Sequence, residues 1–185
     1  MSSSDRLPRP ARSRFLTLAA AGLLAAGVAG CTVQPVFMAG STEFGAAPTG
    51  VSAELAAISI APVSGRVAQE VRNNLIYAFT GGGAAAQPIY DLSLRVNWSE
   101  IRLGFERDES APAYSVTVTA VYELKEIQSG RSITRGTSRG TASYDRSNQQ
   151  FANERARLDA QNRAAQLIAD DIRLRLAAVL ARGGV

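Results

Sequence analysis

Apolar and polar residues alternate strictly between residues 90 and 98, and this period limits the folds open to the chain. The apolar positions are Tyr90, Leu92, Leu94, Val96 and Trp98. Since successive side chains of a strand point to opposite faces, the segment predicts a strand with one face on a core. Beyond Trp98 the apolar phase shifts by one residue, which predicts a bulge at Ser99 and Glu100. The bulge would keep three further residues on the core side: Ile101, Leu103 and Phe105.

Three other segments predict strands. Residues 54–62 predict a short first strand that Pro62 ends, and residues 114–124 alternate as residues 90–98 do. Residues 132–144 are extended but poor in apolar residues, which is typical of an edge strand or of a strand covered by a partner.

Two segments predict helices. Ser64 is a suitable N-cap for a helix that ends at the three glycines 81–83, and its apolar positions are Val67, Val71, Leu75, Ala78 and Phe79. A long helix is expected from about residue 148 to residue 181. Its apolar stripe consists of Phe151, Leu158, Ala165, Ile168, Ile172, Leu176, Val179 and Leu180.

This order of elements predicts an α+β fold, a two-layer sandwich of a four-stranded, largely antiparallel or mixed sheet with two helices on one face (βαβββα). The last three strands should form an antiparallel meander, and the crossover through the first helix should make the first strand parallel to one of them. The expected core is Val71, Leu75, Leu94, Val96, Trp98, Val116, Val118, Tyr122, Ile168, Ile172 and Leu176.

The N-terminal segment is typical of a bacterial lipoprotein. Four arginines precede an uncharged apolar run over residues 15–28, and small residues lead to Cys31, the only cysteine. This order is a basic region, an apolar region and a cleavage site, and the run is shorter than the about 20 residues of a membrane span. We therefore expect a signal peptide at residues 1–30, a lipidated N-terminus and flexible tether at 31–50, and one domain at 51–185.

Composition narrows the function classes. The formal net charge is +4, but removing the four arginines and one aspartate of residues 1–30 leaves +1, so a nucleic-acid partner is not expected. With no histidine and one acylated cysteine, the mature chain cannot build a usual zinc site, a His-based triad or a disulfide. The acidic clusters 106–109 and 170–171 are better explained as a loop and a solvated helix face. We expect a protein that is not an enzyme and has no cofactor beyond the covalent lipid on Cys31.

Several short segments of the mature chain carry distinctive residue patterns: Cys31–Phe37, Gln69–Leu75, Tyr90–Leu92, Tyr122–Leu124, and Tyr144 followed by Phe151 and Ala152. Together they resemble LptE, the lipopolysaccharide-assembly lipoprotein family, in its alphaproteobacterial form. Thr32 and Phe37 depart from the family's common glycine and tyrosine.

The resemblance implies a function without catalysis. A member of this family would plug the outer-membrane β-barrel LptD, support its assembly and help to insert lipopolysaccharide into the outer leaflet. The chain would be anchored by its lipid on the periplasmic side of the outer membrane. The absence of an aspartate after Cys31 also favours outer-membrane sorting. An accessory lipoprotein of another lipid transporter, of the ABC or MCE type, stays open as the alternative.

Arg131, Arg135 and Arg139 are the candidate residues for binding lipopolysaccharide or the partner. Residues four apart on a strand share a face and lie about 13 Å from one another, so the three should form one basic row. Arginine pairs bidentately with phosphate, which fits the phosphates of lipopolysaccharide or an acidic surface of the barrel. The alternative is that the row protects an edge strand against aggregation.

Overall fold

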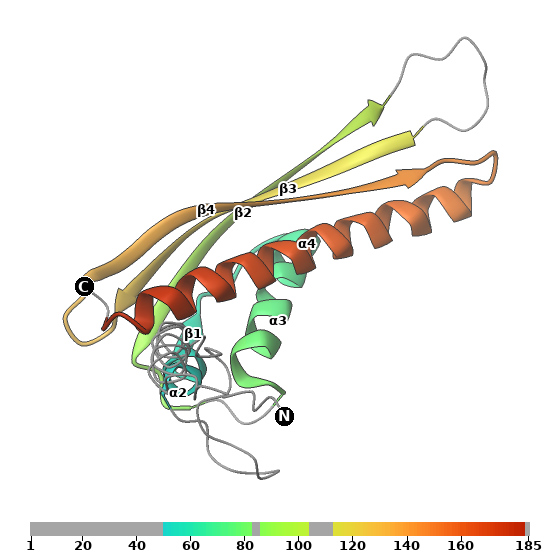
Figure 1. Cartoon of the computed structure of the whole chain (residues 1–185). Coiled ribbons are helices and arrows are strands. Elements are labelled where there is room, and N and C mark those ends of the chain that lie inside the picture. The colour runs from blue at the N-terminus through green and yellow to red at the C-terminus, as the bar shows by residue number, and fades with distance from the viewer. Residues whose placement is uncertain (1–49, 83–85, 104–112, 184–185) are drawn as a thin grey trace, which may run out of the picture. The chain divides into compact units, whose positions relative to one another are not determined.

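The computed structural model describes residues 50–82, 86–103 and 113–183, which belong to one compact unit (Figure 1). The predicted signal peptide, Cys31, and the tether up to residue 49 lie outside the described residues. The elements in chain order are α2 (Val51–Ala56), β1 (Ile58–Ile60), α3 (Arg66–Thr80), β2 (Tyr90–Leu103), β3 (Ala113–Glu126), β4 (Ser132–Asp145) and α4 (Gln150–Leu180).

The four strands form one mixed sheet in the order β1-β2-β3-β4. β1 is parallel to β2, and the other neighbours are antiparallel. This arrangement confirms the predicted α+β class, the meander and the parallel first strand. β4 lies at one edge of the sheet, as its shortage of apolar residues indicated.

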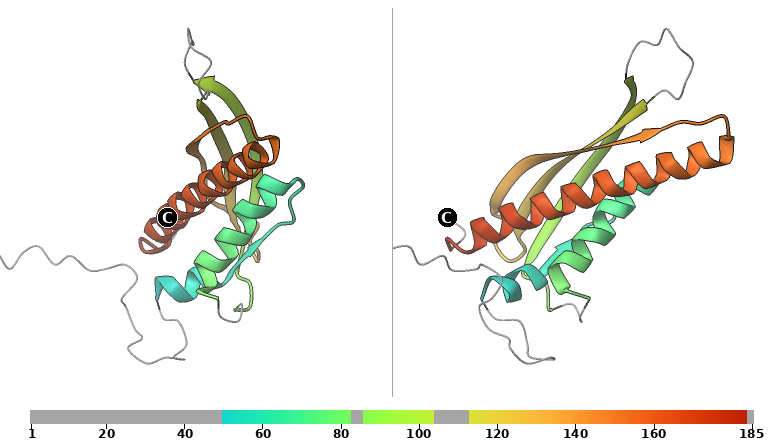
Figure 2. Two further views of the ribbon diagram at one scale, coloured as in Figure 1. Left: turned by 90° about the vertical axis from the view of Figure 1, so that its right-hand side faces the viewer. Right: turned by 45° about the vertical axis from the view of Figure 1, so that its right-hand side comes forward.

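Helices α3 and α4 form the second layer and cover the same face of the sheet (Figure 2). Val71 and Leu75 of α3 and Ile168, Ile172 and Leu176 of α4 are fully buried. They pack with β3, whose even-numbered residues all face the helices and are almost completely buried from 116 to 124: Val116, Val118, Ala120, Tyr122 and Leu124. β3 is therefore the central strand of the core. We call this side of the sheet the helix face and the other side the outer face.

Two element boundaries differ from those predicted. Residues 51–56, expected in part as strand, form α2, because the good helix formers Glu54, Leu55 and Ala56 precede the two β-branched isoleucines of β1. The N-cap of α3 is Gly65 rather than Ser64, and Gly65 has φ 92°, a conformation that disfavours residues with a side chain.

The predicted bulge in β2 is absent. β2 pairs with β3 without a break from Tyr90 opposite Glu126 to Leu103 opposite Ala113, so Ile101 and Leu103 lie on the outer face. The register shift lies instead between β3 and β4. There Leu124 pairs with Thr134 and Lys125 pairs with Ser132, which leaves Ile133 as the extra residue.

The second half of β2 is less buried than predicted. Leu94 and Val96 are half-buried, and Trp98 is 44% exposed. The reason is length: the 15-residue helix α3 covers the start of β2, and α4 lies over β3 and β4.

Helix α4 is continuous over 31 residues, or about 46 Å at 1.5 Å per residue. Its buried side is rich in alanine, which lets the helix approach the sheet closely: Ala160, Ala164, Ala165, Ala169 and Ala177. Phe151, which we had placed on the apolar stripe, is 79% exposed. Within the described ranges, no helix is both long enough and apolar enough to cross a membrane.

Candidate binding surface on the outer face of the sheet

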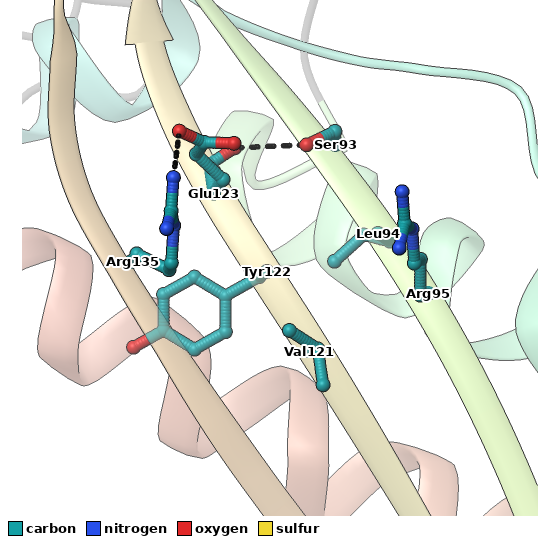
Figure 3. Close-up of a pocket in the computed structure, with 7 residues that line it drawn as sticks. All are labelled: Ser93, Leu94, Arg95, Val121, Tyr122, Glu123 and Arg135. Carbon is teal, nitrogen blue, oxygen red and sulfur yellow. Dashed lines mark hydrogen bonds and ion pairs between the residues drawn. The ribbon is translucent and has the colours of Figure 1, made fainter.

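The outer face carries a shallow hollow of about 430 Å³ between β2, β3 and β4 (Figure 3). Its residues come from three neighbouring strands because Arg95 pairs with Val121 and Glu123 pairs with Arg135. Val121, 44% exposed, supplies an apolar floor between the two arginines. The lining is Ser93, Leu94, Arg95, Val121, Tyr122, Glu123 and Arg135.

Arg135 is held in place by an ion pair. Its guanidinium lies 2.9 Å from Glu123 Oε1, and the Ser132 hydroxyl donates to the same oxygen at 2.9 Å. These hydrogen bonds, first that from Arg135 and then that from Ser132, hold the pKa of Glu123 below its usual value. Glu123 is therefore ionised at neutral pH and orients Arg135 along the outer face.

Arg95 and Arg139 are exposed and make no ion pair or side-chain hydrogen bond with the rest of the described chain. Arg139 pairs across the sheet with Thr119, one row beyond Val121. With Arg135, the three side chains surround Val121 and Thr119 on one face. We call Arg95, Arg135 and Arg139 the outer-face arginines. Such a group can bind phosphate through bidentate hydrogen bonds, beside an apolar contact for the rest of the ligand.

The structure separates the three arginines that the sequence grouped. Arg135 and Arg139 lie on the outer face of β4, as expected. Arg131 precedes β4, and its carbonyl accepts from the amide of Glu126. Because the register shift at Ile133 changes the phase, Arg131 does not continue the row, and any role for it in binding stays a prediction.

The sequence analysis did not propose Arg95 as a binding residue, because Arg95 lies on a different strand, β2, from the basic row of residues 131–139. Its position on the polar side of the alternating segment 90–98 was visible, but its place beside Val121 depends on the strand register.

The helix face of β4 is a packing surface for α4. Gly140 lies directly beneath the backbone of Ala164 in α4. The Ser138 hydroxyl, 1% exposed, donates to Asp171 Oδ2 at 2.6 Å, and Arg175 donates to the other oxygen at 2.9 Å. Burial raises the pKa of Asp171, but these two hydrogen bonds outweigh it and lower the pKa overall. Asp171, expected on a solvated helix face, therefore ties α4 to β4.

The free edge of β4 is protected by α4. Arg163 donates to the carbonyl oxygen of Ser143 at 2.9 Å, and Arg175 donates to that of Thr137 at 3.4 Å. Covering of this kind keeps an edge strand from pairing with other chains. Because Arg163 and Arg175 do this, the outer-face arginines are not needed for it, and the alternative explanation of the basic row loses weight.

Comparison with known proteins identifies the family. The chain is similar to a candidate lipoprotein from Caulobacter crescentus CB15, with 25% identity, 71% of this chain and 96% of that chain covered, and a TM-score of 0.61. It shares its fold with rare lipoprotein B from Shewanella oneidensis, with 12% identity, 70% of this chain and 98% of that chain covered, and a TM-score of 0.51. No curated protein matches the chain.

The sequence model of one family matches residues 55–176, more than half of the chain, and that family is described as LptE, lipopolysaccharide-assembly. The match begins in α2 and ends near the end of α4, so it includes every strand of the sheet and both layers. The chain therefore belongs to the LptE family of lipopolysaccharide-assembly proteins.

Proposed function

We propose that this chain is a lipoprotein anchored through Cys31 to the periplasmic side of the outer membrane, where it plugs an LptD-like β-barrel, supports its assembly and helps to pass lipopolysaccharide into the outer leaflet. Membership of the lipopolysaccharide-assembly family supports the pathway. The order of charges, apolar run and cysteine at residues 1–31 supports the anchor.

The observation that carries the lipid-handling part of the proposal is the arrangement of the outer-face arginines. Lipopolysaccharide offers phosphate groups next to acyl chains. Arg95 and Arg139 have guanidinium groups without partners among the described residues, and Val121 gives an apolar contact between them. We infer that phosphates bind the arginines while the apolar part of the lipid lies over Val121.

Paired variants test this part. Arg95→Gln with Arg139→Gln removes two unpaired charges of the outer face. Arg155→Gln with Arg182→Gln removes two exposed charges at and beyond α4 and serves as the control. The outer-face pair should weaken lipopolysaccharide binding about tenfold, since each charged hydrogen bond is worth about 1.5–3 kcal/mol and exposure reduces that value. Equal binding by both pairs would contradict the assignment.

Co-purification tests the partner. The chain, tagged at its C-terminus, should retain a large β-barrel when the outer membrane is solubilised in detergent. Retention of an inner-membrane ABC or MCE-type transporter instead would support the alternative, an accessory lipoprotein of another lipid-transport system.

A further inference from the structure

β2 has a free backbone edge along most of its length. β1 pairs only with Tyr90, Asp91 and Leu92 (Figure 1). The last bond of this ladder is donated by the amide of Ala61 to the carbonyl of Leu92 at 3.0 Å. β1 ends at Ile60, and Pro62 follows with its φ fixed at about −65°, far from the about −120° of a parallel strand, so the chain leaves the sheet there. In the described part of the chain, no strand pairs with this edge of β2 from Ser93 to Leu103, although β3 pairs with the opposite edge throughout.

The backbone groups on this edge can be assigned from the bonds to the first strand. The amide of Tyr90 donates to Ala57, and the carbonyl of Leu92 accepts from Ala61, so even-numbered residues turn their N–H and C=O toward the edge. Odd-numbered residues turn theirs toward β3. The residues that present backbone groups on the free edge of β2 are therefore Leu94, Val96, Trp98, Glu100 and Arg102.

The two edges of the sheet differ in protection. Arg163 and Arg175 cover carbonyl groups on the edge of β4. Beyond Leu92, no strand of the described residues pairs with the free edge of β2, and residues 93–103 contain no proline or lysine, although they include the charged Arg95, Glu100 and Arg102. Native proteins usually protect an exposed edge by one of these means.

The free edge of β2 is also the more apolar of the two. Trp98 is 44% exposed on the helix face, and Ile101 and Leu103 are 58% and 41% exposed on the outer face. A long edge that pairs with no described strand and carries exposed apolar side chains is suited to accepting another strand, which gains main-chain hydrogen bonds and side-chain contacts together.

Charge indicates what the added strand carries. On the outer face, residues 93–103 of β2 place one charged residue, Arg95, which is exposed and has no partner among the described residues. Cβ atoms of directly opposite residues on neighbouring strands lie about 4.5–5.5 Å apart, so a carboxylate on the incoming strand would reach Arg95. On the helix face the same strand would lie beside Val96 and Trp98, which favour apolar side chains.

A second copy of this chain is a poorer match. If two β2 strands paired edge to edge in one continuous sheet, outer-face residues would lie opposite outer-face residues. Arg95 would then meet no acid, because the outer-face positions 93, 95, 97, 99, 101 and 103 include none.

We propose that the free edge of β2 binds an extended strand of a partner protein, with apolar side chains on the helix face and an acidic side chain beside Arg95. The partner strand lies beside β2 in the position that β1 would occupy if it continued beyond Pro62. Its backbone pairs with Leu94, Val96 and Trp98. This contact shares Arg95 with the proposed phosphate-binding group, but its main energy comes from the backbone, so the peptide exchange experiment tests it independently of lipopolysaccharide binding.

Amide hydrogen exchange on the full-length chain in detergent tests the proposal. The probes are three synthetic peptides of about nine residues, which at about 3.3 Å per residue match the free edge. Each alternates valine with one other residue, which is glutamate, glutamine or lysine. The glutamate peptide should slow exchange at Val96 and Trp98. The amide of Asn97, already bonded to β3, should not change.

The charge contact is tested with one variant and one control. Arg95→Gln should weaken binding of the glutamate peptide about two- to fivefold, the range of a cross-strand charge pair, while Arg155→Gln should leave it unchanged. Three results would overturn the proposal. The first is that no peptide slows amide exchange at Val96 and Trp98, and the second is that all three peptides slow it equally. The third is that these two amides already exchange slowly in the chain alone. The last result would mean that a second copy or another segment of this chain occupies the edge.

Discussion

Replacing Gly140 by alanine tests how closely α4 packs on β4. A Cβ atom at Gly140 would lie 2.3 Å from the carbonyl oxygen of Ala164 and 3.2 Å from Ile168 Cγ1, whereas ordinary contacts begin at 3.4 Å. The first contact is with backbone inside a continuous helix, so no side-chain rotation can relieve it. Either α4 or β4 must move by about 1 Å.

Two opposing effects set the magnitude. In an open strand, replacing glycine by alanine stabilises a protein by about 0.4–1 kcal/mol, because the unfolded chain loses freedom. Overfilling a packed interface costs about 1–3 kcal/mol and occasionally more. Because the contacted atom, the carbonyl oxygen of Ala164, belongs to the backbone, we expect the cost of overfilling to exceed the gain from the unfolded chain by about 2 kcal/mol. For a domain of this size the melting temperature should fall by roughly 5–15 °C.

Chemical and thermal unfolding followed by circular dichroism measures the change. Gly140→Ala combined with Ile168→Val serves as the comparison, since it shortens the neighbouring side chain but leaves the carbonyl of Ala164 in place. The combination should not recover stability. An unchanged or raised melting temperature for Gly140→Ala, or full recovery with Ile168→Val, would refute the close backbone packing.

Three further predictions follow from burial and from the anchor. Tyr144 is buried and donates to Glu100 at 3.0 Å, and burial first, then this bond, raises its pKa to about 12. The stability that the neutral Tyr144 hydroxyl contributes is present below about pH 10 and is lost as the pH rises toward about 12. Glu100→Gln should lower the pKa of Tyr144 in an ultraviolet titration. Ile172→Ala should cost about 2–5 kcal/mol in denaturant unfolding, whereas half-buried Leu94 should cost less on truncation, and equal losses would contradict the assigned burial. Cys31→Ser should leave a folded domain that fractionates as soluble or unprocessed protein, and firm attachment after signal cleavage in a strain without the barrel would argue against the lipid anchor.

The fold could be predicted because its main signals are local. The alternation of residues 90–98 and 114–124 and the three- and four-residue spacing from Val67 to Phe79 identify strands and a helix from neighbouring residues alone. The same local pattern failed beyond Trp98. There the apolar residues Ile101 and Leu103 are on the outer face, and only the pairing with β3 shows that no bulge brings them back.

The binding surface depends on register, which one sequence does not reveal. Arg135 and Arg139 could be placed on one face by counting along β4. Arg131 could not, because the register shift at Ile133 lies between them. Arg95 joins the group only because β2 pairs with β3 and β3 pairs with β4. Its neighbour Val121 lies on β3, between the two arginine-bearing strands. Long-range pairing of this kind leaves no short motif in the sequence.

Surface labelling of lipopolysaccharide in cells depleted of this chain tests the central claim most directly. If the chain acts in lipopolysaccharide assembly as proposed, depletion should lower newly made lipopolysaccharide in the outer leaflet while it accumulates inside the cell, and the natural chain should restore it. The Arg95→Gln and Arg139→Gln pair should restore it less well than the Arg155→Gln and Arg182→Gln control at equal protein level. Unchanged surface lipopolysaccharide after full depletion would contradict the account.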